Sequence, residues 1–185
     1  MVKNTGRERG IFLCAFLFLI GGILGGVSGN LLSAEASAGI RDGLETILNG
    51  GEPNLTRVLL ENYALPLASL FLATSVIGWL LAPLVTLLRG YLLGWAVSAS
   101  IYALGADFGI FLYYGLPALI SVPCLIYITA TSIYISRGVS DVISQRRRSM
   151  PAFNSGRTTA ACLILLFALS VAQVYALPAL MRLIS

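Results

Sequence analysis

Five long stretches without any charged residue constrain this chain more than any other feature. They are 25, 27, 17, 29 and 24 residues long, and they cover 10–34, 62–88, 90–106, 108–136 and 158–181. A helix that crosses a bilayer needs roughly 20 predominantly apolar residues, within a range of about 17 to 25. Each stretch is therefore suited to one crossing, and none is long enough for two.

The stretches predict an all-α integral membrane protein, a bundle of five transmembrane helices in one membrane domain over residues 1–185. Only 11% of the residues are charged, whereas a soluble domain carries about 25%. A β-barrel would need short strands of alternating polarity, and these runs are continuously apolar. We expect the helices near 11–29, 66–88, 90–106, 112–134 and 159–181.

The basic residues predict how the bundle sits in the membrane. With a cytoplasmic N-terminus, the inner segments carry nine basic and two acidic residues, and the outer segments three basic and six acidic ones. Lys and Arg in short loops stay on the cytoplasmic side, so we expect the C-terminus outside. Arg146, Arg147 and Arg148 set this topology, held against anionic lipid. A nucleic-acid partner is not predicted, because no aromatic platform accompanies these arginines.

The segments between the apolar stretches are short. The outer segment 30–65 is the only sizeable one, and it is too small for an independent enzyme domain. A second short helix is expected to start near Leu55. Arg89-Gly90 is interpreted as a tight cytoplasmic hairpin, and 137–157 as a basic cytoplasmic loop.

Two alternatives stay open along the chain. Pro117 and Pro123 interrupt the fourth stretch, and a proline kinks a helix, so 108–116 is either a re-entrant piece or the start of the span. The first stretch has a basic start and small residues at 33–36, as a cleaved signal peptide does. Its apolar part is longer than the roughly 7–15 residues of a signal h-region, which favours a retained helix.

Small residues four positions apart predict where helices pack closely. Such residues share one helix face, and they let two backbones approach in lipid, where dispersion replaces the hydrophobic drive. Packing within one bundle and an interface with another subunit, a second copy included, are both compatible with this spacing. The expected interface residues are Gly22, Gly26, Gly29, Gly90, Gly94, Ser98, Ala168 and Ala172.

Polar groups inside the predicted helices are few. Gln173 is the deepest long one, and we expect it to form an interhelical hydrogen bond. Arg89 and Asp107 fall at helix ends on these boundaries, so no ionisable residue is expected near the bilayer centre. That placement argues against proton-coupled transport by this chain alone.

Catalytic chemistry is not predicted. The chain has no His, which excludes His-based triads and His-ligated metals. Cys14, Cys124 and Cys162 form no Cys-x-x-Cys pair and are expected to pack as small apolar residues. We therefore expect no catalytic, cofactor-binding or metal site, and a protein that is not an enzyme.

The order of these features resembles the stage II sporulation protein M family, a membrane component of the engulfment machinery in endospore-forming bacteria. The resemblance covers nearly the whole chain, and order and spacing carry it rather than any single motif. Its parts are a first helix ending in glycines and Asn at 16–30, then Thr74-Ser-Val-Ile-Gly78, Arg89-Gly90 with Gly94, a proline-bearing fourth span, a basic loop, and the closing Tyr-Ala-Leu-Pro-Ala-Leu-Met-Arg-Leu at 175–183.

The resemblance implies a non-enzymatic scaffold in the bacterial cytoplasmic membrane, specifically the engulfing membrane of the mother cell. Its implied partners are membrane lipid and the stage II sporulation proteins D and P, which degrade peptidoglycan so that this membrane can migrate around the forespore.

The runner-up hypothesis is a transporter or permease subunit, because broken helices can line cavities. It predicts a water-accessible cavity near Gln173, Thr129 or Pro123. A membrane-embedded enzyme is a third reading, and the chain lacks the reactive residues for it.

Overall fold

The computed structural model describes residues 5–31, 54–105, 111–144 and 156–184, and every regular element in these ranges is helical. A π-helical turn, η1 (Phe111–Gly115), leads directly into the fourth long helix. The five long helices are α1 (Thr5–Gly29), α3 (Leu55–Ala73), α4 (Gly78–Leu104), α6 (Leu116–Ile143) and α7 (Gly156–Ile184). The all-helical expectation is confirmed for this part of the chain.

Four of these helices are long and apolar enough to cross a bilayer. The crossing segments are Arg7–Gly29, Gly78–Ala103, Tyr113–Ile143 and Gly156–Ala176. The fifth helix, α3, has 19 residues and carries Arg57 and Glu61 in its first two turns. The chain is therefore a multi-pass membrane protein.

The distribution of side chains is the one that a lipid solvent favours. Large apolar residues face outward, including Phe12 and Phe71 at 78% and 80% exposure. Hydroxyl residues lie inside, and several are fully buried: Ser69, Thr86, Thr129, Thr131, Ser132, Ser136 and Ser170. In hydrocarbon a polar group must find its partner within the protein, so polar residues collect between helices.

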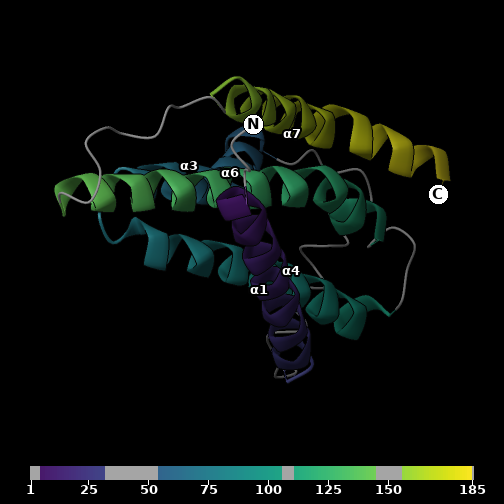
Figure 1. Ribbon diagram of the computed structural model, residues 1–185. Helices are drawn as coiled ribbons and strands as arrows, with labels where there is room; N and C mark the ends of the chain where they lie inside the picture. The colour runs from purple at the N-terminus through teal and green to yellow at the C-terminus, as the bar shows by residue number, and fades with distance from the viewer. Residues whose placement is uncertain (1–4, 32–53, 106–110, 145–155, 185) are drawn as a thin grey trace.

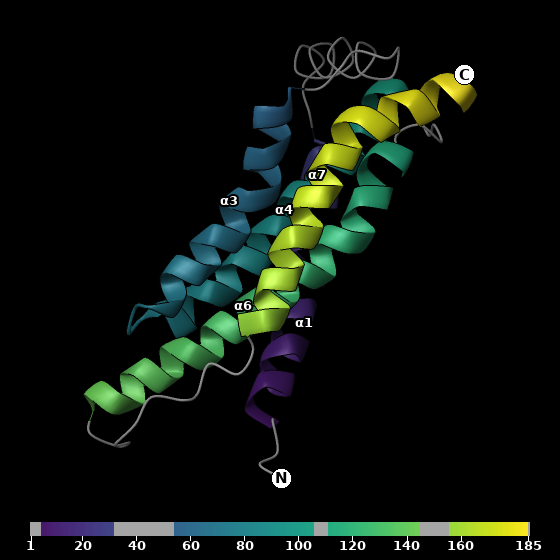
Figure 2. The same ribbon diagram turned by 90° about the horizontal axis from the view of Figure 1, so that it is seen from above.

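The central element is α6, which packs against each of the other four long helices. Figures 1 and 2 show α3, α4, α6 and α7 running alongside one another, while α1 crosses α4 obliquely. The start of α1 and the end of α7 lie at opposite ends of the bundle (Figure 2).

Two apolar clusters hold the bundle together on either side of α6. The first joins α6 and α7 through Cys124, Ile128, Cys162, Leu166 and Leu169, and Tyr63 and Leu70 of α3 pack against it. The second joins α1, α4 and α6 through Cys14, Ala82 and Ile133. All three cysteines are free thiols buried in these clusters, as the sequence predicted.

The turn between α3 and α4 lies at 74–77, so the predicted hairpin at Arg89-Gly90 is wrong. Hydroxyl groups stabilise the observed turn. Thr74 Oγ1 donates to the carbonyl of Phe71. Ser136 Oγ, from α6, donates to the carbonyl of Ser75 at 2.6 Å and accepts from the N–H of Trp79 at 2.8 Å. These contacts satisfy backbone groups that the break in the helix leaves free.

The corrected turn changes the second and third spans. The predicted ranges 66–88 and 90–106 are replaced by α3 and α4, and the outer segment 30–65 loses its last eleven residues to α3. Asn54 caps α3 by accepting from the N–H of Thr56 at 3.0 Å. The ranges 11–29, 112–134 and 159–181 fall within α1, η1 with α6, and α7.

For residues 108–116 the sequence left open a re-entrant piece or the start of the fourth span. Residues 111–115 form η1, which continues into α6, and residues 108–110 lie outside the described residues. Pro123 does not end α6, which runs on to Ile143. Residues 32–53 of the outer segment, and Arg146, Arg147 and Arg148 of the basic loop, lie outside the described residues.

Candidate functional site

The closest helix contact in the described part of the chain joins α1 and α4, and glycine makes it possible. A Cβ atom added to Gly21 or Gly25 would overlap a carbonyl oxygen of α4, that of Leu87 or Tyr91. The reverse holds on α4, where Gly90 and Gly94 face the carbonyls of Phe18 and Gly22. The two backbones therefore touch directly, as small-residue spacing allows in lipid.

The predicted interface residues divide between this contact and its edge. Gly90, Gly94 and Ser98 face α1, and a Cβ on Gly29 would lie 2.8 Å from that of Ser98. A Cβ added to Gly22 would lie 3.8 Å from the carbonyl oxygen of Gly90, which is ordinary van der Waals contact. A Cβ on Gly26 would meet nothing within 4 Å.

Gly22 and Gly26 instead line an open groove beside the contact. The groove has a volume of about 570 Å³ and a mostly apolar wall that includes Phe18, Leu93 and Val97. Gly90 and Gly94 form its other side. At one end Ser98 Oγ donates to Asn30 Oδ1 at 2.9 Å, which gives the groove a polar end.

Ala168 and Ala172 lie on the exposed face of α7 in the part of the chain that the structure describes. The buried face of that helix is formed by Leu166, Leu169 and Ser170.

Gln173 joins α7 to α3, in the interhelical bond that the sequence predicted. Its Oε1 accepts from Asn62 Nδ2 at 2.6 Å, and the same amide donates to Ser170 Oγ at 3.0 Å. Two turns further along α3, the hydroxyl of Ser69 forms a 3.1 Å hydrogen bond with the hydroxyl of Thr129 on α6. These bonds fix α3 against the bundle.

Arg89 does not fall at a helix end, as the charge-free runs predicted, but lies within α4. It is the twelfth of 27 residues in α4, about 16 Å from one end and about 22 Å from the other at 1.5 Å per residue. A charge at such a position costs roughly 2.5–3.5 kcal/mol on insertion scales and marks a functional site by default. No described carboxylate lies within ion-pair distance of Arg89.

A small cavity adjoins Arg89. Its volume is about 10 Å³, and its polar lining comes from Glu61 and Asn62 of α3, Arg89 of α4 and Ser121 of α6. Ser121 is 4% exposed, and its Oγ has no hydrogen-bond partner. Leu65, Pro66 and Leu125 close the cavity.

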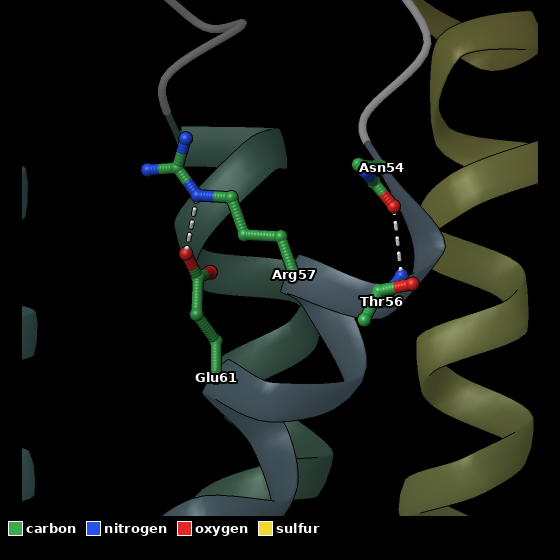
Figure 3. Close-up of polar contacts among 4 residues, drawn as sticks. All are labelled: Asn54, Thr56, Arg57 and Glu61. Atoms are coloured by element: carbon green, nitrogen blue, oxygen red, sulfur yellow. Dashed lines mark hydrogen bonds and ion pairs between the residues drawn. The ribbon is translucent and has the colours of Figure 1, made fainter.

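Glu61 connects this cavity to the surface of α3. Figure 3 shows Arg57 folded towards Glu61 one turn along the helix, with Nε 3.0 Å from the carboxylate oxygen. Arg57 is an exposed residue, and its Nε donates to Glu61 Oε1. Glu61 therefore contacts one exposed arginine and shares the cavity lining with Arg89.

Catalytic and metal chemistry has little support among the described residues. In those ranges no three His, Cys, Asp or Glu side chains gather as metal ligands. Cys124 and Cys162 lie in one cluster, but both are buried in apolar surroundings.

The sequence analysis missed Glu61, Asn62, Arg89 and Ser121 as a group. The signal was present at Thr74-Ser-Val-Ile-Gly78, where two hydroxyl residues and a glycine mark a helix break. A break there leaves a helix of about 27 residues with Arg89 near its middle. The charge-free runs suggested a helix end at Arg89, because dividing the chain at every charged residue places each charge at the end of a helix.

Comparison with known proteins gives no relative for this chain: no family model matches it, no curated protein matches it, and no solved structure matches it.

Proposed function

We propose that this protein is a non-enzymatic membrane scaffold that binds the transmembrane helix of a partner in the groove between α1 and α4. The groove is the observation that carries the proposal. It is open to the surroundings, its wall is apolar, and glycines of both helices line it. A partner helix with small residues could approach these backbones as closely as α1 and α4 approach each other.

The partners we propose are the stage II sporulation proteins D and P, which act on peptidoglycan outside the cytoplasmic membrane.

The proposed topology has the N-terminus inside and the C-terminus outside, with α3 as a fifth crossing. Arg89 no longer counts with the inner residues, and eight basic residues then remain on the cytoplasmic side against two acidic ones. The basic excess still favours this orientation.

Gly26 offers the sharpest test of the groove. Gly26→Leu places a side chain in the groove, and a Cβ at this position meets nothing within 4 Å. The variant is compared with Ala168→Leu, which adds the same side chain on the exposed face of α7. After co-expression with tagged D and P proteins, we expect wild type and Ala168→Leu to co-purify with them and Gly26→Leu to lose at least about tenfold of the captured partner.

Two results would count against the proposal. If the wild-type chain captures neither protein, the D and P proteins are not its partners. If Gly26→Leu and wild type capture equal amounts, the groove is not the interface. Gly90 and Gly94 are poor test positions, because a side chain at either one would disrupt α1–α4 packing itself.

A second candidate function is a transporter or permease subunit, and the interior position of Arg89 favours it. Such a role requires water to reach the site from one side of the membrane. A single cysteine in place of Leu125, which lines the cavity, would then react with a small charged thiol reagent in intact vesicles. Absence of labelling, with labelling after SDS unfolding, speaks for the scaffold.

A further inference from the structure

We propose that the cavity at Ser121 holds one bound water molecule, which links Ser121 to Arg89 and to Glu61, whose side chain is 56% exposed at the surface of α3. The inference is independent of the scaffold function. It rests on the cavity, on the unpartnered hydroxyl and on the two charges that line the same space.

The size of the cavity selects the ligand. A volume of about 10 Å³ is close to the smallest space that accepts one water, about 10–15 Å³. It is too small for a metabolite or a hydrated ion. The lining carries one residue of each charge, Arg89 and Glu61, so the two charges offset each other for a bound ion of either sign.

The polar lining supplies the partners that a buried water needs. A buried water makes two to four hydrogen bonds, about three on average, to otherwise unsatisfied groups. Ser121 Oγ has no partner and is 4% exposed. Arg89 and Glu61 also line the cavity, and their side chains carry N–H donors and a carboxylate acceptor.

The bridge explains how Arg89 remains at this depth. The carboxylate of Glu61 is bound directly to Arg57 and is the charged group that acts electrostatically on Arg89. One water between Arg89 and Glu61 lets a single carboxylate serve both arginines. The side-chain N–H groups of the neighbouring Asn62 already donate to Ser170 and Gln173.

A double-mutant cycle tests the pairing in the full-length chain. The change in the unfolding equilibrium constant is measured by SDS titration in mixed micelles for Arg89→Met, Glu61→Gln and the double variant. We expect the two changes to be non-additive by about tenfold. The same cycle with Arg57→Met in place of Arg89→Met is the control, and an exposed pair gives less than about fivefold.

Substitutions at Ser121 test the water. Ser121→Val fills the cavity and expels the water, so the Arg89–Glu61 coupling should fall to less than about twofold in that background. Ser121→Ala leaves room for the water and should keep most of the coupling. Ser132→Val is the matched control, since Ser132 is buried on the same helix and bonds its own backbone at Ile128.

Infrared spectroscopy supplies a readout that needs no change at Arg89. The spectrum of wild type minus Ser121→Val is recorded in ordinary water and in ¹⁸O-water, and we expect an O–H stretching band that shifts with the isotope. The proposal is overturned if no such band appears, if the cycle is additive, or if Ser121→Val leaves the coupling unchanged. If Arg89→Met does not insert, Arg89→Gln replaces it in the cycle.

Discussion

Gly25 of α1 lies directly over the carbonyl group of Tyr91 on α4, so closely that a Cβ atom would overlap the carbonyl oxygen. One turn earlier Gly21 meets Leu87 in the same way. The four-residue spacing on each helix thus produces a seam in which the backbones are in contact. The same seam exposes Gly26 beside it, on the wall of the groove.

The two glycines therefore differ sharply in their expected tolerance. Gly25→Ala should lower the free energy of unfolding by about 1–3 kcal/mol, because overpacking forces the two backbones apart. Gly26→Ala should change it by less than about 0.5 kcal/mol, as for a surface site. SDS titration of both variants measures the difference, and equal losses would contradict the observed seam.

The bond between Asn62 and Gln173 should contribute measurably to stability. A double-mutant cycle with Asn62→Ala and Gln173→Ala is expected to give a coupling of about 0.6–1.7 kcal/mol, the range found for hydrogen bonds between transmembrane helices. A second cycle, with Gln173→Ala and Ser69→Ala, serves as the control, because Ser69 bonds to Thr129 rather than to Gln173. A coupling no larger than in this control would mean that the amides are not paired in lipid.

The position of the α3–α4 turn can be checked by cysteine accessibility. Val76 lies in the turn and is 40% exposed, whereas Leu88 lies mid-helix in α4. With the native cysteines replaced, Val76→Cys should react with a membrane-impermeant reagent from the cytoplasmic side, and Leu88→Cys should not react from either side. Labelling of Leu88→Cys but not Val76→Cys would restore a hairpin near Arg89.

Terminal tags test the proposed orientation. A tag before Met1 should be protected in intact cells, and a tag after Ser185 should be accessible from outside, because the proposed topology places five crossings between them. Protease protection of the two tagged proteins measures this. Both tags on one side would mean that α3 does not cross the bilayer.

The native thiols should be unreactive in the folded protein. Cys14, Cys124 and Cys162 are 0%, 7% and 9% exposed, and cysteines buried in apolar surroundings are inert. Maleimide labelling in mild detergent should therefore be at least about tenfold slower than after unfolding in SDS. Rapid labelling of the folded chain would show that these clusters open easily.

The amino-acid sequence by itself determined the class of this protein. Long charge-free runs require a helical membrane bundle, because hydrocarbon offers backbone groups no partner outside the helix. Small residues four apart indicated a close helix contact, and Gln173 an interhelical bond. None of these inferences needs to know which helices are neighbours.

Only the tertiary structure decided where one helix ends and which residues meet. The charge of Arg89 suggested a helix end, but the hydroxyl groups of Thr74 and Ser136 stabilise an earlier turn and leave Arg89 in the middle of α4. Ser121 gave no signal of its own. Its role depends on a cavity shared by three helices, and a local sequence pattern carries no information about such a space.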